Sequence, residues 1–244
     1  MVNMQVTKNI FKIHILFYIT GLICFITGFF KNFIIFTSII LIHELGHITS
    51  ALIFKWNIEK VIILPFGGIT IFNERIDKSL LEEFIIAIMG PIFQIIFMII
   101  FKENTLFYNY KKIILFFNLL PIFPLDGSKI LNIFLNKFIC FSYSHVLTLI
   151  ISILISISLI FYENSLVFLL IIFFIIKEVI IDMYKHNYYM NKFFLEKYLY
   201  NDVYKKRKII KNINNMYKQT NHLIKKNNKY YKENEIIFDM FKNN

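Results

Sequence analysis

Residues 41–47 read Leu41-Ile42-His43-Glu44-Leu45-Gly46-His47 and lie within an apolar stretch that runs over 33–54. Residues four positions apart lie on one face of a helix, so His43 and His47 can direct ring nitrogens at one ion about 2.0 to 2.1 Å away. Glu44 lies beside that ion, where its carboxylate can act as a base. The pattern therefore predicts a catalytic zinc site on a membrane-spanning helix.

An accidental match, or a pair of ordinary packed histidines, is the alternative interpretation of this motif. The composition of the chain gives roughly 0.007 accidental matches, which is too few to explain it. Ionisable groups at the centre of a bilayer cost several kcal/mol and usually mark functional sites. Three such groups within one helical turn favour the metal site.

A catalytic zinc ion generally has three protein ligands and an exchangeable water, so a third ligand must come from elsewhere. The best candidate is Asp126, which ends the apolar segment Asn-Leu-Leu-Pro-Ile-Phe-Pro-Leu-Asp-Gly at 118–127. Pro121 and Pro124 remove backbone donors and break the helix, which is tolerated at membrane depth where a broken helix lines a site. The alternative role for Asp126 is a helix N-cap for the run that begins at Ser128.

The wider composition indicates an integral membrane protein. Hydrophobic residues make up 57% of the 244 positions, and a spanning helix needs about 20 mostly apolar residues. We expect an all-α polytopic fold with about six spans, the fourth of which is broken. The expected spans are 10–30, 33–54, 80–101, 106–136, 143–162 and 165–182.

A short β-branched run at 61–72 lies between the second and third expected spans, and Pro65, Gly67 and Gly68 interrupt it. This pattern predicts an extended hairpin or loop, which we expect to be embedded in the membrane. The alternative is a simple surface loop. An embedded strand would supply backbone hydrogen bonds to an extended substrate.

The net charge of +11 lies largely after residue 183, immediately beyond the last apolar stretch. Positive charge in that position orients membrane proteins, so we expect both termini to be cytoplasmic and assign the charge to topology, not to binding of nucleic acid. We divide the chain into a transmembrane domain, 1–182, and a basic cytoplasmic tail, 183–244. Within the tail, the pattern of residues 188–200 predicts an amphipathic helix on the membrane surface. The alternative is a soluble helix that is followed by a solvated segment.

Both motifs resemble those of the site-2 protease family of intramembrane metalloproteases, which has HELGH in one span and an Asn-to-Leu-Asp-Gly segment in a later one. The resemblance covers about residues 10–200 and is greatest to the sporulation branch of the family, which processes pro-sigma-K. Further shared features are Lys12-Ile13-His14, Trp56-Asn57-Ile58, Leu64-Pro65-Phe66-Gly67-Gly68, Glu82-Glu83-Phe84, Gly90-Pro91 and Asn118 through Gly127.

The resemblance implies one zinc ion held by His43, His47 and Asp126, with Glu44 as the general base. It assigns a strand beside the substrate to Pro65, Phe66, Gly67 and Gly68. The amide of Asn118 is either an ordinary interhelical hydrogen bonder or a group that holds the substrate backbone beside the metal.

Some residues depart from the family pattern. Gln94 stands where many members have Asn, and Ser128 replaces a common Gly. The residues after Tyr200 are too few for a complete nucleotide-sensing CBS domain, which sporulation relatives can carry. The resemblance therefore does not extend to regulation by ATP, and the sequence leaves open whether the protein senses a nucleotide.

The implied partners are a pro-sigma-K-like precursor, inhibitory membrane proteins of the sporulation complex and membrane lipid, in the mother-cell membrane that surrounds the forespore. The family also allows oligomers. A housekeeping site-2 protease that cleaves a membrane-bound regulator is the alternative within the family. From other classes, a metal transporter would use the same ligands without requiring Glu44, and an inactive scaffold would not require a buried charged cluster.

Overall fold

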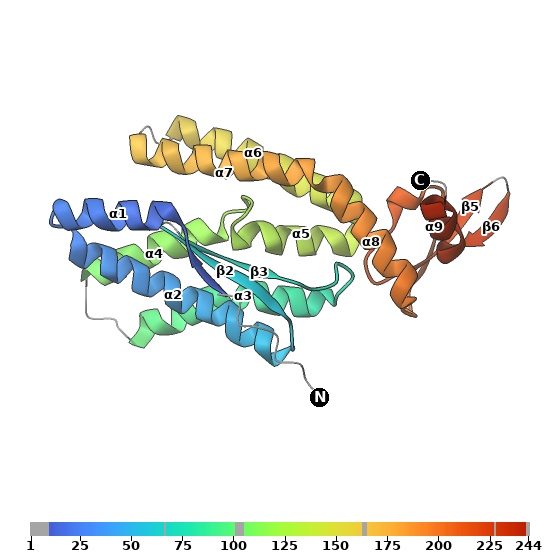
Figure 1. The fold of residues 1–244 in the computed structure, drawn as a ribbon, viewed down its shortest axis with the longest axis horizontal. Helices are drawn as coiled ribbons and strands as arrows, with labels where there is room; N and C mark the ends of the chain where they lie inside the picture. The colour runs from blue at the N-terminus through green and yellow to red at the C-terminus, as the bar shows by residue number, and fades with distance from the viewer. Residues whose placement is uncertain (1–9, 66, 101–104, 163–164, 227, 243–244) are drawn as a thin grey trace. The chain divides into compact units, whose positions relative to one another are not determined.

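The computed structural model describes residues 10–65, 67–100, 105–162, 165–226 and 228–242 (Figure 1). The chain divides into two compact units. The first comprises Met1–Glu74 and Ile85–Leu120, and the second comprises Arg75–Phe84 and Pro121–Asn244. This division differs from the predicted domain boundary at 182, because the segment 75–84 and the helices after 120 group with the C-terminal residues.

In the first unit, helices pack with a small sheet. The helices are α1 (Ile15–Ile26), α2 (Phe30–Ile53), α4 (Thr105–Leu119) and most of α3 (Leu80–Ile100). The strands β1 (Phe11–Ile13), β2 (Ile58–Leu64) and β3 (Gly67–Phe72) form one sheet in that order. The expected hairpin is present as the antiparallel pair β2 and β3. The expected all-α class is wrong in this respect, since residues 11–13, assigned to a spanning helix, pair with β2 instead.

The helices of the first unit approach each other closely at Gly46. A Cβ atom at this position would lie 2.7 Å from the carbonyl carbon of Met89 and 2.9 Å from the Cα of Gly90. Further along α2, Ala51 packs in one cluster with Trp56 and with Ile86 of α3. Glycine is therefore required at Gly46 for α2 and α3 to pack at this distance.

The second unit contains helices and a second sheet. Its helices are α5 (Asp126–Phe138), α6 (Phe141–Tyr162), α7 (Leu166–Tyr184), α8 (His186–Tyr200) and α9 (Glu233–Lys242), with a short 3-10 turn at Ile213–Asn215. The strands β4 (Arg207–Ile210), β5 (Asn221–Lys226) and β6 (Lys229–Lys232) pair in that order, β4 parallel and β6 antiparallel to β5.

The C-terminal residues form a folded core, so the predicted solvated tail is wrong. Phe193 and Phe194 of α8 are 0% and 2% exposed, and their cluster includes residues of β4, the 3-10 turn, β5 and α9. The same cluster includes Ile210, Met216, Ile224 and Ile237. The buried face of α8 therefore packs against protein, and the placement of its exposed apolar face on a membrane surface stays a prediction.

Among the described residues, three helices are long and apolar enough to cross a membrane: α2, α3 and Phe141–Phe161 of α6. The helix α1 has 12 residues and α4 has 15, fewer than the roughly 20 that a straight crossing needs. The predicted interruption of the fourth span is present, because α4 ends at Leu119 and α5 begins at Asp126. The six-span count stays a prediction.

Candidate metal centre

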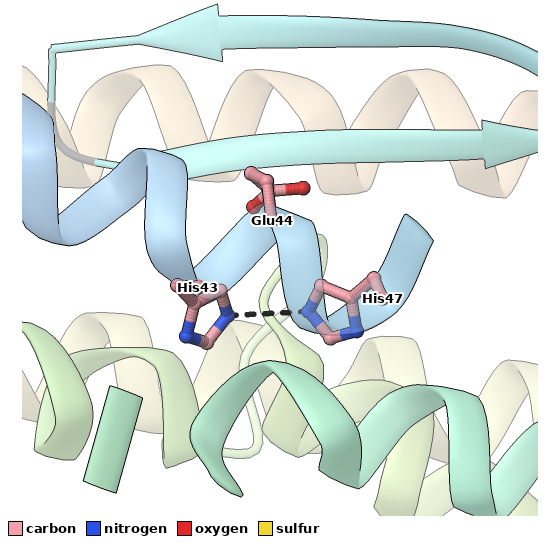
Figure 2. Close-up of side chains that lie close together, drawn as sticks. All are labelled: His43, Glu44 and His47. Atoms are coloured by element: carbon pink, nitrogen blue, oxygen red, sulfur yellow. Dashed lines mark hydrogen bonds between the residues drawn. The ribbon is translucent and has the colours of Figure 1, made fainter. Parts of the chain in front are cut away.

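His43, Glu44 and His47 lie together on the buried side of α2 (Figure 2). They are 1%, 3% and 3% exposed. The two Nε2 atoms are 3.2 Å apart, and one ligand atom from each of the three residues lies within 4.8 Å of the others. Among the described residues, His43, Glu44 and His47 are the one group of at least three His, Cys, Asp or Glu side chains close enough together to hold a metal ion.

The two histidines are oriented by oxygen atoms of α3. Nδ1 of His43 lies 3.1 Å from the amide oxygen of Gln94, and Nδ1 of His47 lies 2.7 Å from the carbonyl oxygen of Ile86. Because both partners are acceptors, each Nδ1 carries the proton and donates it. The lone pairs are then on the two Nε2 atoms, which face each other. This tautomer and this outer partner are typical of histidines that bind a metal, so the donor set fits a zinc ion.

Glu44 is oriented from the opposite side of α2, by the strand β3. The hydroxyl of Thr70 donates a hydrogen bond to Oε2 of Glu44 at 2.6 Å. Gly68, two residues earlier on the same face of the strand, has backbone so close to Glu44 that a Cβ would collide with its carboxylate. The helix α2 therefore presents its base to β3 and its histidines to α3.

Gly90 is a site residue that the sequence analysis noted only as part of a family feature. A Cβ on Gly90 would collide with the ring of His47 and lie 2.8 Å from Nε2 of His43. The contacts of Thr70 with Glu44 and of Gln94 with His43 were likewise not predicted from the sequence. A signal was present for Thr70, because residues two apart on a strand share a face and Gly68 was already a candidate.

Among the predicted substrate-binding residues, Gly68 lies directly beside Glu44, and Gly67 precedes it on the same strand. Gly67 and Gly68 begin β3, and Pro65 lies in the turn before it. Oδ1 of Asn118, a residue that is 6% exposed, lies 3.6 Å from the position a Cβ of Gly67 would take. Phe66 lies outside the described residues. The structure therefore brings Asn118 to the start of β3, and contact with a substrate stays a prediction for all of these residues.

Known proteins share the part of the sequence that contains His43, Glu44 and His47. A family model described as Peptidase family M50 matches residues 31–110. The chain is 38% identical over 153 residues to Stage IV sporulation protein FB of Bacillus subtilis, which covers 57% of this chain and 53% of that protein. It is 36% identical over 118 residues to Zinc metalloprotease MJ0392 of Methanocaldococcus jannaschii, with coverage of 43% and 34%.

Residues 31–110, about a third of the chain, are therefore similar to peptidase family M50. The solved structure of Site-2 Protease from Methanocaldococcus jannaschii matches the fold of the chain with a TM-score of 0.55 at 24% identity, over 69% of this chain and 88% of that one. The chain spans about half the length of the Bacillus relative and about a third of the length of the Methanocaldococcus zinc metalloprotease.

Asp126, the predicted third ligand, lies beyond the residues that match the family and belongs to the second unit. The residue is 6% exposed, and its Oδ1 lies 3.0 Å from Nζ of Lys129. It is the first residue of α5, and Leu125 is the N-cap. The alternative role of Asp126 as the N-cap is therefore wrong, and its role as a zinc ligand stays a prediction.

The turn that precedes Asp126 is held by α6. The backbone N–H of Phe123 donates to Oγ of Ser152 at 2.9 Å. Ser152 belongs to a polar stripe that repeats every four residues along α6 and is buried throughout, at no more than 4% exposure: Ser144, Thr148, Ser152 and Ser156. Ser152 contacts the backbone of the broken segment, whereas Ser144 and Thr148 bond to the side chains of Asn136 and Asn132 in α5.

Proposed function

We propose that this chain is an intramembrane zinc metalloprotease, in which His43, His47 and Asp126 hold one zinc ion and Glu44 is the general base. The observation that supports this most strongly is the pair of Nε2 atoms 3.2 Å apart, with a carboxylate beside them, in the interior of an apolar helix. A buried cluster of this kind is costly unless a ligand uses it.

The chemistry follows from how the residues are held. A bound zinc ion polarises the scissile carbonyl and lowers the pKa of water towards 7. Glu44 takes the proton of the attacking water and then gives it to the leaving amine. Because the hydroxyl of Thr70 holds Oε2, Oε1 is the oxygen that we assign to proton transfer.

The substrate enters this scheme as an extended segment, because a helix hides its carbonyls in internal hydrogen bonds. The order β1-β2-β3 leaves β3 as an edge of its sheet among the described residues. An extended substrate that pairs with this edge would pass Gly68, next to Glu44. We assign substrate contact to Pro65, Phe66, Gly67, Gly68 and Asn118.

The finer proposal concerns topology and substrate. We propose six spans with both termini in the cytoplasm, in which α1, α4 with α5, and α7 complete the three long apolar helices. We also propose that the substrate is a pro-sigma-K-like precursor in the mother-cell membrane around the forespore, with inhibitory membrane proteins as partners. The similarity to Stage IV sporulation protein FB supports this choice over a housekeeping site-2 protease.

The test is cleavage of a tagged pro-sigma-K-like precursor that is co-expressed with the protein. Glu44→Gln and Asp126→Ala should each reduce the product by a factor on the order of 10² or more, because each removes a group that acts on the reacting atoms. The matched control is Glu59→Gln, which changes an exposed carboxylate of β2 in the same way. Undiminished cleavage by Glu44→Gln would overturn the proposed base, and zinc flux without cleavage would favour a transporter.

A further inference from the structure

The C-terminal sheet is built from a segment with an unusual charge distribution. Residues 205–232 contain ten Lys and Arg residues and no Asp or Glu. All three strands of the sheet come from this segment. The sheet therefore carries positive charge with no acidic residue of its own strands to balance it.

Strand pairing divides the side chains of this sheet between two faces. Ile209 pairs with Leu223, Leu223 with Lys232, and Lys225 with Tyr230, so these side chains share one face. On the other face, Ile210 and Ile224 are buried in the core. We define the outer face as the exposed set Arg207, Ile209, Leu223, Lys225, Tyr230 and Lys232.

Three acidic residues of the second unit are paired with cations that do not belong to this face. Asp77 lies 2.9 Å from Nζ of Lys197, and Glu83 is bonded to Lys218. Glu233 lies 2.8 Å from Nδ1 of His222, whose side chain is on the buried side of β5. These carboxylates neutralise interior cations, and so they do not neutralise the cations of the outer face.

The outer face is turned away from the membrane-crossing helix of the same unit. Phe141, at the start of α6, packs in the C-terminal core, and its backbone N–H donates to the carbonyl of Met216 at 3.0 Å. The helix α9 contacts both α8 and β5, and Figure 1 shows β5 and β6 on the side of α9 that is far from α8. The strands β5 and β6 therefore lie beyond α9 as seen from α8, whereas the apolar helix α6 contacts α8.

The outer face combines cations with exposed apolar side chains. Ile209 is 62% exposed and adjoins Leu223, which is 38% exposed. An aliphatic strip bordered by Arg and Lys fits carboxylates that flank an apolar side chain. Surfaces that bind single-stranded nucleic acid combine cations with aromatic rings on which bases stack, and among the described residues this face offers one such ring, Tyr230.

We propose that the outer face docks an acidic segment of a cytoplasmic protein, in which Asp or Glu residues flank an apolar side chain. The site lies outside the metal centre and does not depend on the proposed protease activity. Its cations attract the segment and set its orientation, while Ile209 and Leu223 bury the apolar side chain.

The test uses the full chain in nanodiscs of zwitterionic lipid and a fluorescent 12-residue peptide of repeated Asp-Glu-Leu. Fluorescence anisotropy should show binding that weakens as salt rises, with no binding of a matched Asn-Gln-Leu peptide. The double variant Lys225→Glu/Lys232→Glu should weaken binding by about tenfold or more, since each substitution replaces an attraction to the acidic peptide with a repulsion. Leu223→Asn should also weaken it, at unchanged charge.

The matched control is Lys185→Glu/Lys242→Glu, which makes the same charge change at exposed positions off the outer face. This control should retain the wild-type affinity, and the unfolding midpoints of both double variants should equal that of the wild type. Equal weakening by the control, or no binding by the wild type at low salt, would overturn the proposal. Tighter binding of a 12-nucleotide DNA strand, or of nanodiscs with anionic lipid, through the same two lysines would overturn the assignment to an acidic protein.

Discussion

The metal centre and the C-terminal unit both bury ionisable side chains, but they compensate the cost in different ways. In the C-terminal unit, Lys197 and Asp77 are oppositely charged, and their side chains are 3% and 6% exposed at a separation of 2.9 Å. At the metal centre, His43 and His47 turn their lone pairs toward each other, and an amide and a carbonyl hold their other nitrogens.

This difference separates a structural network from a reactive site. The buried opposite charges of Lys197 and Asp77 attract each other, and hydrogen bonds to Thr220, Tyr204 and Gln219 satisfy their remaining polar atoms. Two facing lone pairs repel each other and are satisfied by a cation between them. The chemical type and orientation of the neighbouring groups, and not burial itself, therefore distinguish the metal centre from the structural ion pair.

The largest expected effect comes from Gly90→Ala at the metal centre. The new Cβ collides with the ring of His47, so the two Nε2 atoms must separate. We expect loss of bound zinc and a fall in cleavage on the order of 10², the usual effect of a displacement near 1 Å at a reacting centre. The control is Gly21→Ala, whose Cβ would meet only the movable ring of Phe33, at 3.1 Å. Full zinc content in Gly90→Ala would contradict the geometry.

The next largest effect is expected at Lys197, in the buried ion pair of the C-terminal unit. Lys197→Met leaves the carboxylate of Asp77 buried without its ammonium partner, and loss of one partner of a buried pair costs about 3 to 5 kcal/mol. Hydrogen exchange of β4 to β6 should accelerate, while zinc content stays unchanged. Lys192→Met, which removes a more exposed partner of Glu196, should cost about 0.3 to 0.5 kcal/mol. A loss of zinc in Lys197→Met would show that the two regions are not separate in function.

A smaller effect is expected at Ser152, which accepts the hydrogen bond of Phe123 before Asp126. Ser152→Ala leaves that buried N–H unsatisfied, at a cost of about 1 to 3 kcal/mol. We expect weaker zinc binding in a chelator competition, with recovery in Ser152→Thr and no change in the exposed control Ser158→Ala. Unchanged zinc affinity in Ser152→Ala would separate this turn from the metal.

The smallest effect is a pH dependence at the start of α8. Burial, together with the nearby His145, lowers the pKa of His186 below its ordinary value of 6.5, although Asp182 opposes the shift. Because the unfolded chain takes up the proton first, this contribution to stability is complete above about pH 6.5 and is lost as the pH falls through the folded pKa. His186→Asn should flatten the fall in unfolding midpoint between pH 7.5 and 5.5. Parallel profiles for variant and wild type would exclude this role.

The sequence predicts the metal centre better than its surroundings because ligand spacing is local. His43 and His47 are one helical turn apart, so their convergence follows from the helix alone. Gln94, Thr70 and Gly90 contribute through the packing of α3 and β3 against α2, which a single sequence does not specify.

The C-terminal core was not predictable in the same way. Its buried residues Ile210, Met216, Ile224 and Ile237 come from three short elements and from the residue that follows the 3-10 turn. Each element contributes too few of them to give a recognisable helical or strand periodicity. The surrounding Lys and Asn residues give the segment the composition of a solvated tail. The sheet β1-β2-β3 was missed in part for a related reason, since Phe11–Ile13 is apolar enough to continue into the helix that follows.

The most direct test of the account is the zinc content of the purified protein in four forms: wild type, Glu44→Gln, His43→Ala and His47→Ala. Metal analysis after removal of loosely bound ions should find one zinc per chain in the wild type and in Glu44→Gln, because the base is not a ligand. It should find none in either histidine variant. Zinc that persists at full occupancy in His43→Ala and His47→Ala would contradict the central claim that these two nitrogens hold the catalytic ion.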